Sequence, residues 1–123
     1  MSYVDGFVLA CPKANKEAFI EHAKLIDPMF LEFGATRVME CWQDDLSKGE
    51  TTDFYRAVQA KDDEAVCFSW IEWPDKQTRD TGMAKLEEVM ATDPRMDAEK
   101  NPMPFDGKRM IYGSFTSVFS AER

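Results

Sequence analysis

The sequence is poor in the side chains that most often bind metals. It contains one histidine, His22, and three scattered cysteines, Cys11, Cys41 and Cys67, none of which forms a CxxC pair. Neither the number nor the spacing of these side chains fits a zinc site. An odd number of isolated cysteines is typical of free thiols in a reducing compartment. We therefore expect three free cysteines and no metal, and the sequence implies no cofactor.

Positive charge is scarce as well. The chain carries 15 Lys and Arg against 23 Asp and Glu, which gives a formal net charge of -8. Affinity for nucleic acids, and for anionic membrane surfaces, comes largely from cations that neutralise phosphates. Hydrophobic runs fall far short of the roughly 20 residues that a membrane-spanning helix needs, and the first residues do not resemble a targeting peptide. We expect a cytoplasmic protein that binds neither nucleic acid nor membranes.

Apolar residues are abundant: 44% of the 123 residues are hydrophobic, enough for one folded domain over residues 1–123. The periodicity of these residues predicts the order β-α-β-β-α-β. Strands are expected at 3–11, 35–45, 65–73 and 108–119, and helices at 15–33 and 75–91. This is the ferredoxin-like α+β arrangement, a four-stranded antiparallel sheet with two helices on one face.

Local signals refine these boundaries. Asn15 and Asp75 are suited to cap the starts of the two helices, and Gly34 is suited to end the first one. Gly82 is expected to weaken the second helix. The segment 54–60 is interpreted as an extension of the hairpin that leads into the third strand.

The predicted strands are apolar on both faces, although two helices can cover only one face. In the third strand, Phe68 and Trp70 point to one face, and Cys67 and Ile71 point to the other. A monomer with such a sheet would expose a large apolar patch, which soluble monomers avoid. We therefore expect a homodimer with its sheets packed face to face. The alternative is a monomer in which the loop 50–64 folds over the open face.

Several segments together resemble the DUF1428 (YbaA-like) family, an uncharacterised bacterial family. They are YVDGFV at 3–8, FGA at 33–35, ECW at 40–42, FSWIEWP at 68–74, RD at 79–80, DPRM at 93–96 and MPFDGKRMIYGSF at 103–115. Two residues, Trp73 and Ser114, depart from the pattern of that family. The resemblance implies the dimeric α+β barrel superfamily, whose other members include monooxygenases and small decarboxylating or dehydrating enzymes. It implies no activity for this chain, because fold does not fix function.

His22 is a candidate catalytic residue because it borders the apolar stripe of the first helix, next to Phe19 and Ile26. A partly buried histidine can act as a general base near neutral pH. The alternative is an amphipathic side chain at the edge of the stripe, with no chemical role.

Arg79 is a candidate ligand-binding residue because it shares the inward face of the second helix with Met83. A guanidinium in that position needs an anionic partner, since an unpaired buried charge is costly. The acids predicted within strands, Asp5, Glu40 and Glu72, are candidate partners and candidate site residues. Either a structural ion pair between helix and sheet or a cleft for an anionic or carbonyl compound satisfies this requirement.

Trp42 and Tyr112 are candidates to line a ligand cavity, because their aromatic rings carry polar tips. Packing in the core or dimer is the alternative. The sequence as a whole favours a homodimer that binds a small molecule, with an oxygenase- or isomerase-like enzyme as one hypothesis for its activity. A non-catalytic binding or assembly module is the competing hypothesis.

Overall fold

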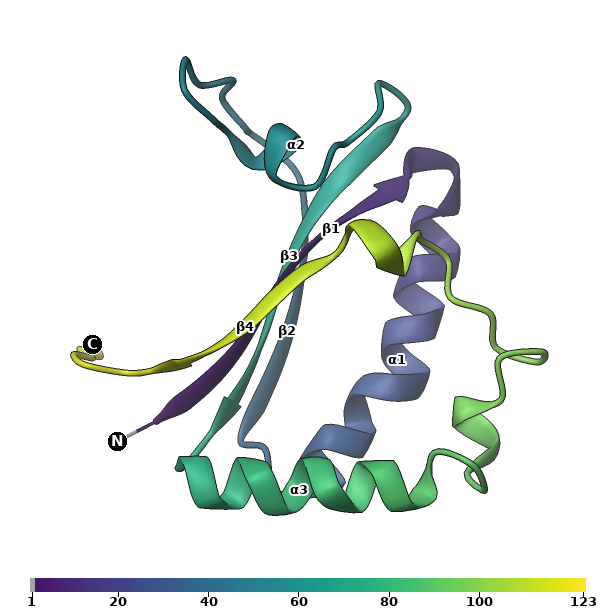
Figure 1. Ribbon diagram of the computed structural model, residues 1–123, viewed down its shortest axis with the longest axis vertical. Coiled ribbons are helices and arrows are strands. Elements are labelled where there is room, and N and C mark those ends of the chain that lie inside the picture. Colours follow the sequence, from purple (N-terminus) through teal and green to yellow (C-terminus); the bar gives the residue numbers. More distant parts are fainter. Residues whose placement is uncertain (1) are drawn as a thin grey trace.

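The computed structural model describes residues 2–123, and its regular elements follow the predicted order with one added helix (Figure 1). The strands are β1 (Tyr3–Pro12), β2 (Arg37–Trp42), β3 (Glu64–Trp73) and β4 (Ile111–Thr116). The helices are α1 (Lys16–Glu32), α2 (Phe54–Ala57) and α3 (Lys76–Val89). Short 3-10 turns occupy Lys13–Asn15, Pro94–Met96 and Gly107–Arg109.

The four strands form one antiparallel sheet in the order β2-β3-β1-β4. Gly6 lies at its centre, opposite Trp70 of β3 on one side and Gly113 of β4 on the other. Helix α1 lies over one face of the sheet, and α3 runs across the end of that face (Figure 1). The predicted ferredoxin-like α+β fold is confirmed. No helix within residues 2–123 is long and apolar enough to cross a membrane.

The segment 54–60 is not part of a hairpin, and the prediction was wrong there. Asp53 caps a short helix instead, because its side chain accepts a hydrogen bond from the Arg56 amide at 2.8 Å. Val58, which follows α2, is 1% exposed and packs with Ala10 and Val66 against the sheet face opposite α1. The loop thus covers one end of the face that the helices leave open.

Two capping predictions had different outcomes. Asp75 caps α3 as expected, accepting a hydrogen bond from the Thr78 amide at 2.7 Å. Asn15 does not cap α1, because its side-chain amide instead donates to the Pro104 carbonyl at 2.9 Å. That bond fastens the start of α1 to the segment before β4, a contact that local sequence cannot predict. Gly34 ends α1 with a positive φ of 116°, a conformation that favours glycine.

Gly82 is buried at the contact between α3 and the sheet, so it is more than a weak point in the helix. A Cβ atom at this position would lie 2.6 Å from the Phe33 carbonyl oxygen and 2.8 Å from a ring carbon of Trp73. The missing side chain lets α3 approach Trp73, which is 1% exposed. Close packing here requires glycine despite its low helix propensity.

The core between α1 and the sheet is built around buried residues of β1 and β3. Its members are Leu9, Cys11, Phe19 and Cys67, and a second cluster near α3 contains Ala35, Ile71 and Trp73.

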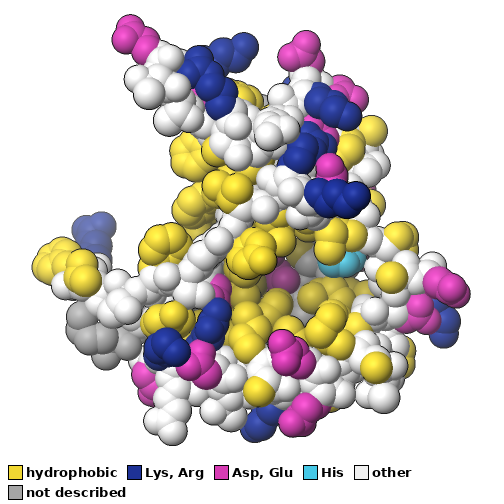
Figure 2. Space-filling model, viewed as in Figure 1, with side chains coloured by type: hydrophobic (Ala, Val, Ile, Leu, Met, Phe, Trp, Pro, Cys, Tyr) yellow, Lys and Arg dark blue, Asp and Glu magenta, His cyan; other side chains and the backbone are white. Residues whose placement is uncertain are grey.

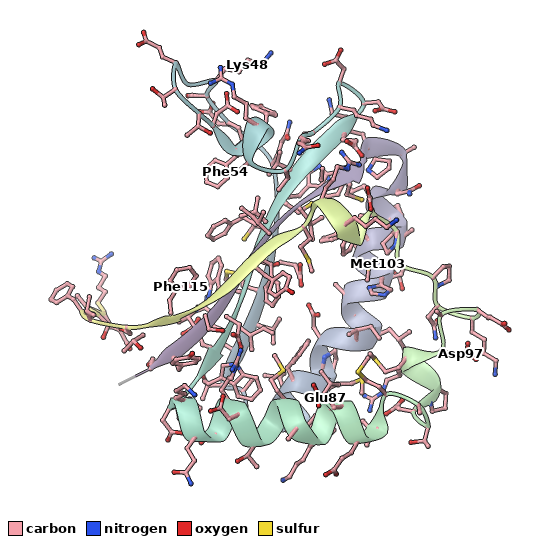
Figure 3. All side chains as sticks on the ribbon, in the orientation of Figure 1. Lys48, Phe54, Glu87, Asp97, Met103 and Phe115 are labelled. Atoms are coloured by element: carbon pink, nitrogen blue, oxygen red, sulfur yellow. The ribbon has the colours of Figure 1, made fainter. Side chains whose placement is uncertain are left out.

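The sheet face opposite α1 is apolar and open to solvent beyond the loop that carries Val58. Figure 3 shows Phe54 and Phe115 projecting from this open side, away from α1. The exposed residues there include Phe68, Ile111 and Phe115, at 44%, 46% and 62%.

Candidate functional site

A cavity of about 140 Å³ lies between α1 and the sheet. Figure 2 shows the corresponding hollow, with hydrophobic side chains around it and the single histidine and an acidic group inside. Most of the walls are apolar, and include Phe7, Leu9, Phe19, Ile26, Phe30 and Phe105. The polar lining residues are His22, Asp27, Glu40 and Ser69.

The carboxyl groups of Asp27 and Glu40 meet in this cavity. Asp27 projects from α1, and Glu40 projects from β2, opposite Ser69 of β3. The two carboxyls lie close enough to perturb each other's pKa, and Ser69 lies beside Glu40. Alternation along the strands places Glu40 and Ser69 on the face that α1 covers. Three elements therefore bring polar side chains together in an otherwise apolar cavity.

This environment perturbs the protonation of both carboxyls. Burial among apolar walls, followed by the charge of Asp27 and the hydrogen bond to it, raises the pKa of Glu40 to about 8. Burial likewise raises the pKa of Asp27, although its hydrogen bond to Glu40 and the nearby His22 oppose that rise. Glu40 nevertheless remains exposed to solvent on one side, because the cavity is open there. The pair holds a proton at neutral pH, because two adjoining carboxyl groups resist ionising together.

His22 lies in the same cavity. Burial lowers the pKa of its imidazole, and the Asp27 carboxylate opposes that effect. The ring is therefore neutral at neutral pH and has one nitrogen free to accept a proton. Together, the imidazole and the carboxyl pair can donate and accept protons within an apolar enclosure, which is the chemistry of general acid–base catalysis.

Arg79 and Asp5 lie elsewhere, at the contact between α3 and the sheet. Arg79 donates from Nη2 to Asp5 Oδ1 at 3.0 Å and from Nε to Asp5 Oδ2 at 3.2 Å. The remaining partners of Asp5 are Trp73 Nε1 at 3.0 Å and Ser114 Oγ at 2.6 Å, both donors. The two residues that depart from the family pattern thus both bind Asp5. This carboxylate is 3% exposed and fully paired, as in a structural ion pair.

The other candidate residues are dispersed. Glu72 lies on the open face, where it accepts a hydrogen bond from Trp70 Nε1 at 2.9 Å. Tyr112 is 74% exposed at the edge strand and stacks on Phe7, with ring centroids 6.4 Å apart. Trp42 packs against Phe19 in the core, with ring centroids 5.8 Å apart. Of the predicted site residues, the structure brings only His22 and Glu40 together in the cavity.

Sequence reasoning missed Asp27, although the chain contains a signal for it. Asp27 follows Ala23 by four positions and precedes Phe30 by three, so it lies on the apolar stripe of α1. An acid on an inward helical face needs a polar partner or a ligand, as does Arg79 on α3.

Within residues 2–123, no group of three His, Cys, Asp or Glu side chains is placed to hold a metal ion.

Comparison with known proteins places the chain in a family. The DUF1428 profile, described as a protein of unknown function, matches residues 2–107. This chain belongs to the DUF1428 family. It is 52% identical over 118 residues to the uncharacterized protein YbaA of Escherichia coli K12, a match that covers 96% of this chain and 97% of YbaA. The DUF1428 family that the sequence segments suggested is thereby confirmed.

Solved structures that are similar in fold share little sequence with this DUF1428 protein. A dimeric ferredoxin-like protein from an uncultured marine organism superposes with a TM-score of 0.57 at 10% identity, covering 98% of each chain. SnoaB, a cofactor-independent oxygenase from Streptomyces nogalater, superposes with a TM-score of 0.52 at 14% identity, covering 99% of this chain and 98% of SnoaB. Identities this low support the shared fold alone.

Proposed function

We propose that this protein is a homodimer that binds a small organic molecule in the cavity between α1 and the sheet. One observation carries the proposal: an apolar cavity into which α1, β2 and β3 together bring only four polar side chains that titrate or carry a hydroxyl, His22, Asp27, Glu40 and Ser69. Small-molecule sites have this construction, in which apolar walls supply affinity and a few polar groups fix orientation.

The size of the cavity limits the ligand. Its volume of about 140 Å³ is close to that of engineered apolar cavities that bind benzene, on the order of 150 Å³. Pockets for drug-sized ligands are larger, roughly 300–1,000 Å³. The ligand that fits best is therefore a single ring or a short chain with one polar group.

The open face of the sheet supports the dimer. It carries a broad hollow of about 660 Å³, lined by Val4, Val8, Phe68, Ile111 and Phe115. Soluble monomers avoid contiguous apolar surfaces of this kind. A second copy is the simplest cover, because a two-fold axis pairs the same patch with itself. The similar protein from a marine organism is described as dimeric, which agrees with this proposal.

An enzyme of oxygenase or isomerase type fits this site, since the carboxyl pair and His22 can move protons on a bound ligand. The fold shared with SnoaB is compatible with such chemistry. A cytoplasmic location belongs to the same proposal, and the free Cys11, Cys41 and Cys67 support it.

A non-catalytic binding or assembly module is the second candidate function. The observation that favours it is the internal pairing of polar groups: among residues 2–123, every buried side-chain nitrogen or oxygen has a hydrogen-bond partner. Arg79, a candidate ligand-binding residue, is held by Asp5.

Titration with toluene, followed by amide NMR shifts, tests the cavity. Shifts are expected at residues that line the cavity, such as Ile26 and Ile71, and Ala23→Phe should abolish them by filling the space. Ala84→Phe, on an exposed position of α3, is the matched control and should change nothing. Shifts confined to the open face, or none at all, would show that the cavity is not a binding site.

A further inference from the structure

We propose that the cavity binds a neutral molecule through a hydroxyl group that donates a hydrogen bond to the carboxyl pair of Asp27 and Glu40, and that it excludes carboxylates. This inference rests on the proposed function, because it names the class of ligand for the same cavity. It differs from the anionic or carbonyl ligand that was one of the two alternatives for Arg79.

The contact between the two carboxyls fixes the charge of the site. Asp27 of α1 and Glu40 of β2 both line the cavity, and each perturbs the pKa of the other. Two adjoining carboxyl groups resist ionising together, so one of the two keeps a proton at neutral pH. The other group is ionised at neutral pH, and the pair therefore carries about one negative charge.

No cation balances that charge within the cavity. The titratable groups that face it are His22 and Asp27 from α1 and Glu40 from β2, while β3 contributes the neutral Ser69. Within residues 2–123, no Lys or Arg lines the cavity. Arg79 is paired with Asp5, and Arg109 is paired with Glu64. A ligand carboxylate would thus meet a like charge in a mainly apolar cavity, which is unfavourable.

A hydroxyl group suits the carboxyl pair better. It can donate to the ionised carboxyl, and hydrogen bonds to an ionised acceptor are about twice as strong as those between neutral groups. An ether of the same shape cannot donate and forfeits that bond. The rest of the ligand then lies against Phe7, Phe19 and Phe30, which suit an aromatic ring.

Binding of three benzene derivatives to the unaltered protein at pH 7 tests the inference. The probes are phenol, anisole and benzoate, and NMR titration at the residues lining the cavity gives each dissociation constant. Phenol should bind at least about ten-fold more tightly than anisole, from a charge-assisted hydrogen bond of about 1.5–3 kcal/mol. Benzoate should show no binding at concentrations that saturate phenol.

The double variant Asp27→Asn/Glu40→Gln removes the charge while preserving shape. The preference for phenol over anisole should shrink to less than about three-fold, and weak binding of benzoate should appear. Asp80→Asn, which removes a carboxylate from the exposed surface of α3, is the control and should alter none of the three constants. If the double variant does not fold, the dissociation constants of phenol, anisole and benzoate for the unaltered protein still test the inference.

The outcomes separate this inference from the proposed function. Equal binding of phenol and anisole, or benzoate binding as tightly as phenol, would overturn the inference while toluene binding still upholds the cavity. Failure of toluene and of all three probes would overturn both.

Discussion

Arg79 and Asp5, 74 residues apart in the sequence, form a two-point ion pair between α3 and β1. Ser114 of β4 closes the arrangement, because its hydroxyl accepts from Arg79 at 2.8 Å and donates to Asp5 at 2.6 Å. The buried Asp5 carboxylate thereby links α3 to β1 and to its neighbouring strand β4.

Replacing Arg79 with alanine should destabilise the fold, because Asp5 would remain buried without its cation. A loss of about 3 kcal/mol in the free energy of unfolding is expected, measured by urea denaturation. Lys85→Ala, on the same helix but exposed, should cost less than about 0.5 kcal/mol. A cost for Arg79→Ala as small as that of Lys85→Ala would show that the pair contributes nothing. Phenol binding to the folded Arg79→Ala protein should be unchanged.

Stability should fall as the pH rises from about 4.5 towards 8. The pKa of Glu40 is raised from its ordinary value of 4.5 to about 8 in the folded chain. The native state therefore binds more protons than the unfolded state within that window, and the free energy of unfolding decreases with pH. Urea denaturation at several pH values measures this slope, which Glu40→Gln should flatten.

The control for that slope is Glu87→Gln, an exposed position of α3 (Figure 3). It should leave the dependence on pH as it is in the unaltered protein. A slope that survives Glu40→Gln in full would mean that Glu40 does not hold the extra proton.

Gly82→Ala should lower the melting temperature, although alanine is the better helix former. The added Cβ would meet the Phe33 carbonyl oxygen and the Trp73 ring, both closer than 3.0 Å. Overpacking of this kind costs roughly 1–3 kcal/mol, more than the ~1 kcal/mol that helix propensity returns. Thr81→Ala, exposed and adjacent, should not destabilise. An increase in melting temperature for Gly82→Ala would contradict the tight contact.

Phe115→Asp should produce monomers, because it places a charge in the centre of the proposed dimer interface. Sedimentation velocity at micromolar concentration should show a dimer for the unaltered chain and a 14.1 kDa species for the variant. Leu31→Asp, at an exposed apolar position of α1, is the matched control and should stay dimeric. A monomeric unaltered protein would refute the dimer directly.

The fold was predictable because each signal is local or periodic. Alternation in β3 assigned Phe68 and Cys67 to opposite faces, as the structure has them. Asp75, as an N-cap residue, correctly predicted the start of α3. The short helix α2 was missed because Phe54 and Val58 suit strands by composition, whereas the Asp53 cap and burial against Ala10 decide the structure.

The site was predictable only in part, because its residues meet through tertiary packing. Arg79 was expected to need a carboxylate, yet the sequence offered three and gave no means to select Asp5. Tertiary packing makes that choice, since Glu72 faces the open side, Glu40 lies below α1, and Asp5 lies beside α3. Asp27 joins Glu40 only because α1 crosses β2, and helical periodicity alone does not specify which strand a helix crosses.

The loop that carries Val58 divides the open face of the sheet into two parts with different behaviour on dilution. Its end of the sheet, around Ala10 and Val66, is sealed within a single chain at any concentration. The end formed by Ile111 and Phe115 can be shielded only by another molecule. Dilution should therefore speed amide hydrogen exchange in β4 while leaving exchange at Val66 unaffected.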